Sequence, residues 1–239
     1  EYWEKVVRIA KSVSLQRTWR ALPIMGREMS PTDTETAWVY YPCMQAADIF
    51  HMQLHVACAG VDQRKAHMLA REAAQKLGWM KPVSVHVPIL IGLQGLQVTQ
   101  QQFDENAEIN LQISSKMAKS VPKTCIFVHD SPEEIEEKIK AAYCPPKEVW
   151  GNPVLQIAKL IIFNERSTLI ILRAQEYGGP EEFESYEALE KAYVNGNLHP
   201  LDLKKGVAEA LIEILGPARE YFRTHPQNLE KMKDIEITR

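Results

Sequence analysis

Three polar side chains spaced for one face of a helix are the residues best suited to binding a small polar ligand. Tyr41, Gln45 and Asp48 follow one another at steps of four and three, which places them on one helical stripe. Pro42 is expected to be the first residue of that helix, with Tyr41 at the cap. Burying polar groups without partners costs several kcal/mol. The stripe therefore predicts a polar ligand, and the open alternative is a core helix whose polar groups are satisfied internally.

Gln63 is a further candidate for ligand binding because of the strand that precedes it. Residues 54–60 and 83–88 are short apolar runs, and both are predicted to be buried strands. Asp62 is expected to cap the helix between them, and Gly78 to end it. This order predicts a parallel sheet with a right-handed crossover. Gln63 then lies just beyond the carboxyl end of the first strand, where open parallel sheets bind ligands, although it can also be a plain helix residue.

Two lysines in a loop of small residues form a second group with chemical potential. Lys116 and Lys119 lie three residues apart within 114–120, and a flexible basic loop can hold a phosphate. The preceding segment, 97–112, is rich in Gln and acidic residues and low in apolar ones, which predicts a mobile insertion.

Beyond Asp130 the sequence predicts mainly helices. Their expected starts carry capping residues with Pro or acids close behind them: 130–134, Asn152-Pro153 and Ser185. Residues 168–172 are predicted to be a strand. The change in pattern predicts two domains, an α/β portion over 1–129 and a helical one over 130–239.

Composition limits the class of protein. The chain has 239 residues and a net charge of -3, which argues against binding nucleic acid through bulk positive charge. Four scattered cysteines without metal-ligand spacing favour reduced thiols in the cytoplasm and no metal site. No apolar run is long enough to span a bilayer, so we expect no membrane partner. The negative net charge agrees with the expectation of no DNA partner. The chain begins at Glu1 within a helical pattern, as expected for the interior of a longer protein.

Taken together, these stretches resemble tyrosyl-tRNA synthetase of the archaeal and eukaryotic type, a class I aminoacyl-tRNA synthetase. The matching segments agree in order and spacing through nearly the whole chain: Tyr41-Pro42 with Gln45 and Asp48, then 61–65, 67–72, 116–120, 130–135, 148–153, 185–187 and 198–200. The resemblance implies an α/β fold, the distal half of a Rossmann-type parallel-sheet catalytic domain followed by a helical anticodon-binding domain. It also implies tyrosine, ATP and tRNA(Tyr) as partners, and a homodimer.

The resemblance assigns the polar stripe to the amino acid substrate. Tyr41, Gln45 and Gln63 would surround the amino group of tyrosine, and Asp48 would accept a hydrogen bond from its phenolic hydroxyl. Phenylalanine would leave that buried acceptor unpaired. The standard case of this effect is itself a tyrosyl-tRNA synthetase, which favours tyrosine over phenylalanine by about 10⁵-fold.

The lysine loop resembles the class I signature Lys-Met-Ser-Lys-Ser, with Ala118 at the middle Ser. The resemblance implies that Lys116, Met117, Lys119 and Ser120 bind ATP, which carries Mg2+ as a substrate complex without a protein-bound metal. The tyrosine carboxylate attacks the α-phosphate and needs no general base, since it is already ionised. Lys116 and Lys119 are the expected catalytic residues, because cations stabilise charge growing on the leaving pyrophosphate. The other signature, His-x-Gly-His, is absent from the 239 residues, so this chain alone is expected not to form tyrosyl-adenylate.

Three residues of the helical part are implied to read the tRNA anticodon. Tyr177 would stack on the first base, Asp202 would accept from its edge, and His199 would lie near the second base. Without the resemblance, these residues are also consistent with a purely structural role. Tyr177 would then be a surface residue in a Gly-rich turn, and Asp202 would only interact favourably with the positive end of the helix that begins there. Tryptophanyl-tRNA synthetase is a rival within the class, and a non-catalytic RNA-binding module derived from this fold is a rival outside it.

Overall fold

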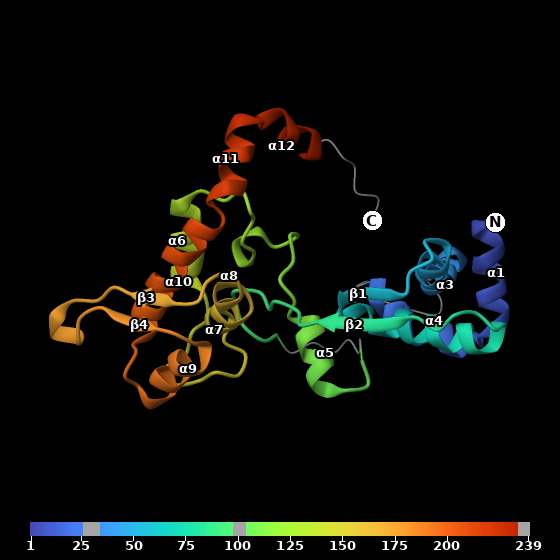
Figure 1. Cartoon of the computed structure of the whole chain (residues 1–239), viewed down its shortest axis with the longest axis horizontal. Helices are drawn as coiled ribbons and strands as arrows, with labels where there is room; N and C mark the ends of the chain where they lie inside the picture. The colour runs from blue at the N-terminus through green and yellow to red at the C-terminus, as the bar shows by residue number, and fades with distance from the viewer. Residues whose placement is uncertain (26–33, 98–103, 234–239) are drawn as a thin grey trace. The chain divides into compact units, whose positions relative to one another are not determined.

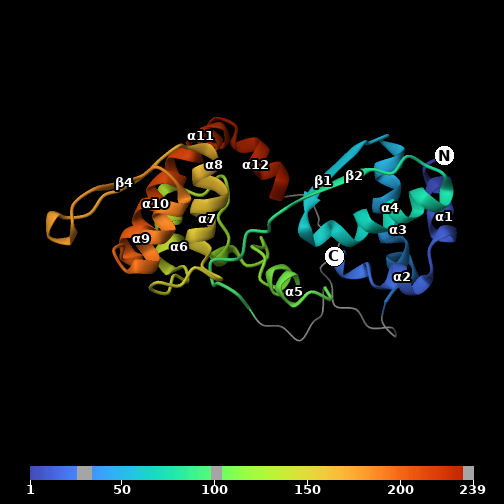
Figure 2. The same ribbon diagram turned by 60° about the horizontal axis from the view of Figure 1, so that its bottom comes forward.

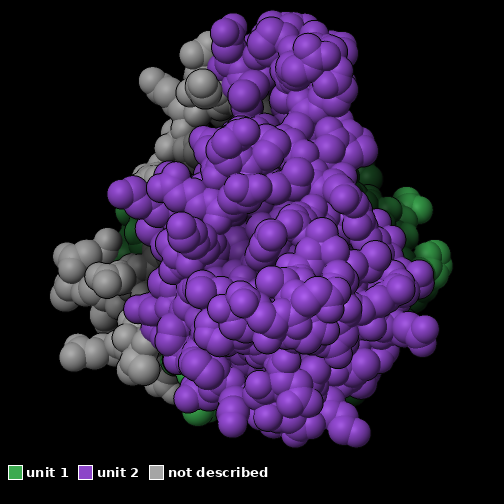
Figure 3. Space-filling model, turned by 90° about the vertical axis from the view of Figure 1, so that its left-hand side faces the viewer, with its two compact units in different colours: residues 1–89, 98–114 green, residues 90–97, 115–239 purple. Residues whose placement is uncertain are grey.

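The structure is a computed structural model that describes residues 1–25, 34–97 and 104–233. The chain divides into two compact units (Figures 1 and 3). Unit 1 comprises residues 1–89 and 98–114, and unit 2 comprises residues 90–97 and 115–239. The boundary between these compact units is not the predicted boundary between functional domains at 129/130. The lysine loop at 116–120 belongs to unit 2.

Unit 1 is an α/β unit in which three helices pack together beside a small parallel sheet. Its elements are α1 (Tyr2–Ser12), α2 (Leu15–Trp19), η1 (Leu22–Met25), α3 (Thr36–His51), β1 (Val56–Gly60), η2 (Val61–Gln63), α4 (Arg64–Leu77), β2 (Val83–Val87) and α5 (Ala107–Ser114). Helices α1, α3 and α4 contact one another. Alanines fill much of the space between α3 and α4, including Ala46, Ala47, Ala70 and Ala73, and such small side chains let two helices approach closely.

The helix that carries the polar stripe begins earlier than its proline predicts. Helix α3 starts at Thr36 after the N-cap Glu35, so Pro42 lies inside it and Tyr41 is not at the cap. The prediction that Pro42 opens the helix is therefore wrong. An interior proline costs a helix about 3 kcal/mol, and the buried face of α3, with Cys43 at 1% exposure, offsets that cost through packing.

The predicted strand, helix and strand are confirmed. Strands β1 and β2 pair in parallel, with Val56 opposite Val83 and Gly60 opposite Val87. Gly78 ends α4 with a left-handed φ of 67°, a conformation that glycine adopts without strain. Asp62 is not the cap, because it lies within η2 and Gln63 is the N-cap of α4.

The two faces of the sheet differ in exposure, since the side chains of one face are buried or half-buried. Its exposed face carries side chains that are 44–55% exposed: Val56, Val83, Val85 and Val87. The prediction of buried strands is therefore wrong for this face in the present chain. Parallel sheets are usually covered on both faces, so this apolar face is suited to a further layer of structure.

Unit 2 is mainly helical, with one short antiparallel hairpin. Its elements are η3 (Pro122–Thr124), α6 (Pro132–Ala141), α7 (Pro153–Ile157), η4 (Ala158–Ile162), α8 (Phe163–Glu165), β3 (Leu169–Ile171), η5 (Gln175–Tyr177), β4 (Glu181–Phe183), α9 (Tyr186–Asn195), α10 (Pro200–Ile214), α11 (Gly216–Thr224) and α12 (Pro226–Lys233). Strand β3 packs against α10, and the segment that joins β3 to β4 projects away from the helices (Figure 2). The core of unit 2 includes the buried residues Ile135, Leu155, Ile171, Tyr193 and Leu211.

The capping signals of unit 2 are confirmed. Ser131 and Glu134 form a reciprocal capping box at the start of α6, and Asn152 and Ser185 cap α7 and α9 through their side chains. The predicted insertion over 97–112 is partly helical, since α5 begins at Ala107. Residues 98–103 of it lie outside the described residues.

Candidate functional site

The structure brings three of the four predicted tyrosine-binding residues together in unit 1. The Gln45 side-chain nitrogen donates to the Tyr41 hydroxyl oxygen at 3.2 Å and to the Gln63 amide oxygen at 3.0 Å. The Gln63 nitrogen in turn donates to the Ile24 carbonyl at 3.4 Å. Helix α3 supplies the first two residues and the turn after β1 supplies Gln63. A phenol and two amides thus meet at the carboxyl end of a parallel strand, as the family resemblance implies.

The fourth residue, Asp48, has an internal partner that the sequence does not reveal. The Tyr2 hydroxyl of α1 donates to Asp48 Oδ1 at 2.7 Å and lies 3.3 Å from the Met44 carbonyl. Burial and the neighbouring Asp48 carboxylate raise the pKa of Tyr2 to about 12. Tyr2 and Asp48 are 46 positions apart, so only the packing of α1 on α3 could have identified this pair.

These contacts define what the polar stripe can bind. Gln45, Asp48 and Gln63 are half-buried, and Tyr41 is 36% exposed. The hydroxyl and amide oxygens can accept hydrogen bonds from an ammonium group. A carboxylate accepts through two oxygens, so the bond from Tyr2 to Asp48 Oδ1 leaves acceptor capacity for a second hydroxyl. The polar groups are also partly satisfied by one another, as the internally paired alternative expects.

The predicted ATP-binding loop lies in unit 2. Ile91 and Lys116 form an isolated antiparallel bridge, and the Met117 amide donates to the Leu90 carbonyl at 2.7 Å. The Met117 side chain packs against the core of unit 2. Lys119 and Ser120 are exposed, so the second lysine is accessible to a phosphate in solution.

The three predicted anticodon residues lie on two segments of unit 2. Tyr177 is 67% exposed at the end of η5, in the turn between β3 and β4. His199 is the N-cap of α10, and its Nδ1 accepts from the Leu201 amide at 3.2 Å. Asp202 lies half-buried in the first turn of the same helix. The aromatic ring, the imidazole and the carboxylate are all on exposed or half-buried parts of one unit.

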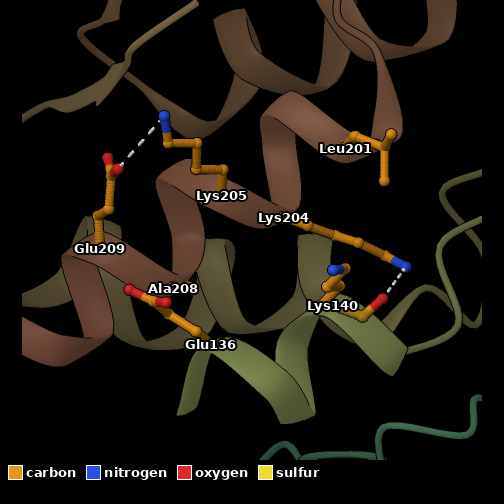
Figure 4. A pocket seen from close by; sticks show the side chains of 7 residues that line it. All are labelled: Glu136, Lys140, Leu201, Lys204, Lys205, Ala208 and Glu209. Atoms are coloured by element: carbon orange, nitrogen blue, oxygen red, sulfur yellow. Dashed lines mark hydrogen bonds and ion pairs between the residues drawn. The ribbon is translucent and has the colours of Figure 1, made fainter. Parts of the chain in front are cut away.

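A separate hollow of about 320 Å³ lies between α6 and α10. Its lining is basic on balance: Glu136, Lys140, Leu201, Lys204, Lys205, Ala208 and Glu209 (Figure 4). Lys204 donates to the Lys140 carbonyl at 2.9 Å, and Lys205 lies 3.9 Å from Glu209. None of these lining residues belongs to the three predicted sites, so the hollow does not mark any of them.

Other chemistry is limited among the described residues. In 1–25, 34–97 and 104–233, no group of three or more His, Cys, Asp or Glu side chains could hold a metal ion. Within the same ranges, no helix has the length and apolar character that crossing a membrane requires. The four cysteines are free thiols.

Comparison with known proteins shows the family to which the chain belongs. A family model described as tRNA synthetases class I (W and Y) matches residues 1–100 and 109–216, and the chain belongs to this family. The tyrosine–tRNA ligase of Aeropyrum pernix is 48% identical over 241 residues, covering 99% of this chain and 65% of the relative. That of Thermococcus kodakarensis is 46% identical over 253 residues, covering 100% of this chain and 66% of the relative.

Solved structures agree with this assignment. The tyrosyl-tRNA synthetase from Pyrococcus horikoshii, complexed with L-tyrosine, matches with a TM-score of 0.88 and 42% identity, covering 98% of this chain and 65% of that one. A tryptophanyl-tRNA synthetase from Encephalitozoon cuniculi bound to tryptophan matches with a TM-score of 0.57 and 20% identity, over 92% of this chain and 52% of that one. That second likeness shows the fold alone. The chain spans about 65% of the length of the curated relatives it matches.

Proposed function

We propose that the chain contributes to the ATP-dependent charging of tRNA(Tyr) with L-tyrosine. The observation that supports this most is the convergence of Tyr41, Gln45 and Gln63 at the end of β1, with Asp48 one helical turn further along α3. The tyrosine–tRNA ligases that match the chain along almost its entire length support the same choice of amino acid.

In this proposal the polar stripe of α3 selects and orients tyrosine. The ammonium group donates to the Tyr41 hydroxyl and to the amide oxygens of Gln45 and Gln63. The phenolic hydroxyl donates to Asp48 beside the existing bond from Tyr2. Phenylalanine would leave that acceptor with one partner fewer, and an unsatisfied acceptor in a desolvated site is costly.

The lysine loop acts on the nucleotide. ATP enters as its Mg2+ complex, and Lys116, Met117, Lys119 and Ser120 contact it. The tyrosine carboxylate oxygen forms a bond to the α-phosphorus while the bond to the bridging oxygen breaks and pyrophosphate leaves. Lys116 and Lys119 stabilise the charge that grows on pyrophosphate. The exposure of Lys119 suits a loop that closes on its substrate. Because no group needs to deprotonate the nucleophile, this work is electrostatic and positional.

The helical part recognises the tRNA. The Tyr177 ring stacks on the first anticodon base, Asp202 accepts from that base's edge, and His199 lies near the second base. The high exposure of Tyr177 supports a stacking role. We assign catalysis to residues 1–129 and anticodon recognition to residues 130–239, and propose a homodimer. Free thiols at all four cysteines support a cytoplasmic setting.

Amino acid-dependent exchange of pyrophosphate into ATP tests this function in the intact protein that carries the chain. We expect exchange with L-tyrosine and none with L-tryptophan. Exchange that depends on tryptophan would end the tyrosine assignment. Binding of tRNA without exchange for any amino acid would instead favour the non-catalytic RNA-binding module.

A further inference from the structure

Arg173 links the two segments that carry the predicted anticodon residues. It lies just after β3, and its side chain is only 10% exposed. Its Nε donates to the Gly179 carbonyl at 2.8 Å, and its Nη1 donates to the Asn197 carbonyl at 2.9 Å. The remaining amino group, Nη2, pairs with the Glu181 carboxylate. One planar guanidinium thus holds three acceptors on two different segments.

The first of these segments presents Tyr177. The turn is closed by backbone hydrogen bonds from Tyr177 and Gly179 to the Ala174 carbonyl, at 2.9 and 3.1 Å. Gly178 has a φ of 99°, and a Cβ there would lie 3.2 Å from the Arg173 guanidinium. The turn therefore rests directly on Arg173, and the position of the Tyr177 backbone depends on that contact.

The second segment leads into α10. Asn197 lies two positions before His199 and five before Asp202. Its amide donates to the Ala192 carbonyl at 2.9 Å, and the next residue, Leu198, is 2% exposed in the core. The Asn197 carbonyl is thus a fixed point just before the start of α10. The hydrogen bond from Arg173 to the Asn197 carbonyl therefore fixes the position of the Tyr177 turn relative to α10.

We propose that Arg173 is a positioning residue for anticodon recognition, which holds the Tyr177 ring in register with Asp202 so that both can engage the first anticodon base. This rests on the proposed function, since it uses the roles assigned there to Tyr177 and Asp202. Only Arg offers a rigid fork of donors for three separated acceptors. Lys at this position keeps the charge but cannot make all three contacts at once.

The test uses four anticodon stem-loop RNAs of tRNA(Tyr): the cognate one and three in which the first anticodon base is replaced by each of the other bases. Their binding is measured to the full chain and to its Arg173→Lys variant. We expect the variant to bind the cognate RNA about tenfold more weakly, equivalent to about 1.4 kcal/mol and within the range of one base stack. Binding of the other three RNAs changes little, so discrimination at the first base shrinks. Glu181→Gln, which keeps the shape of the side chain, shifts discrimination in the same direction by less.

Arg166→Lys is the matched control, because Arg166 also pairs with a carboxylate, Glu213 at 2.6 Å, elsewhere in unit 2. It should leave all four affinities unchanged. Unchanged discrimination in Arg173→Lys, or an equal loss for all four RNAs, would overturn the proposal. Tyrosine-dependent pyrophosphate exchange, measured in parallel in the intact protein that carries the chain, is expected to be the same in wild type and Arg173→Lys. Absence of exchange in the wild type would refute the proposed function, while the RNA measurements would still decide the role of Arg173.

Discussion

Replacing Tyr2 by Phe tests whether Asp48 is held in place from α1. The substitution keeps the ring, whose edge contact with the His51 ring has a centroid distance of 5.2 Å, and removes the hydroxyl that donates to Asp48 at 2.7 Å. A hydrogen bond to a charged group contributes about 1.5 to 3 kcal/mol. Both partners are only half-buried, so we expect the free energy of unfolding to fall by about 1 to 2 kcal/mol.

The pH dependence gives a second signature. The pKa of Tyr2 is raised to about 12 in the folded protein, against about 10 in an unfolded chain. The stabilisation is therefore fully present below about pH 10 and is lost as the pH rises towards about 12. The difference in stability between wild type and Tyr2→Phe should shrink over this interval, while titration of other groups cancels in the comparison.

Urea denaturation followed by tryptophan fluorescence suits this measurement. The chain has five tryptophans, and four of them lie in unit 1: Trp3, Trp19, Trp38 and Trp79. The signal therefore reports mainly on the unit that contains Tyr2. Tyr40→Phe on α3, at a residue that is 43% exposed, is the control and should change stability little. Equal stability of wild type and Tyr2→Phe at neutral pH, or a difference that persists above about pH 12, would refute the reasoning.

Three further predictions concern charged and titratable groups. Burial lowers the pKa of both His67 and His86, so unfolding free energy should fall as the pH drops below about 6.5; urea titrations of His67→Leu should show a flatter pH dependence, and an unchanged slope would contradict this. Asp48→Ala should reduce the preference for tyrosine over phenylalanine in pyrophosphate exchange by about tenfold or more, and unchanged selectivity would remove Asp48 from its role. Lys119→Ala should slow adenylate formation by about tenfold or more while tyrosine affinity stays nearly constant; an equal loss of affinity, measured by calorimetry, would argue against that placement.

Local signals in the sequence predicted much of the fold. The strand, helix and strand of unit 1, the glycine at the end of α4 and the capping box at Ser131 all depend on residues close together in sequence. Pro42 misled because its local preference for a first turn is outweighed by burial of α3 along its length. Asp62 misled because it lies within a 3-10 turn that precedes the start of α4.

The candidate sites were predictable only in part. Helical spacing placed Tyr41 and Gln45 on one face of a helix. Only the family resemblance grouped Gln63 with them, and the structure joins all three by hydrogen bonds. Tyr2 and Arg173 carried no local signal, because their roles arise from contacts with distant segments. The exposed face of the β1–β2 sheet was also unpredictable, since an apolar strand pattern does not say which layers are present to cover it.

A crystal structure of the intact protein with L-tyrosine tests the central claim most directly. We predict that the ammonium group lies within hydrogen-bonding distance of Tyr41, Gln45 and Gln63, and that the phenolic hydroxyl lies on Asp48 beside the bond from Tyr2. Tyrosine bound elsewhere, or the four side chains bonded only among themselves and Tyr2 at saturating tyrosine, would contradict the account.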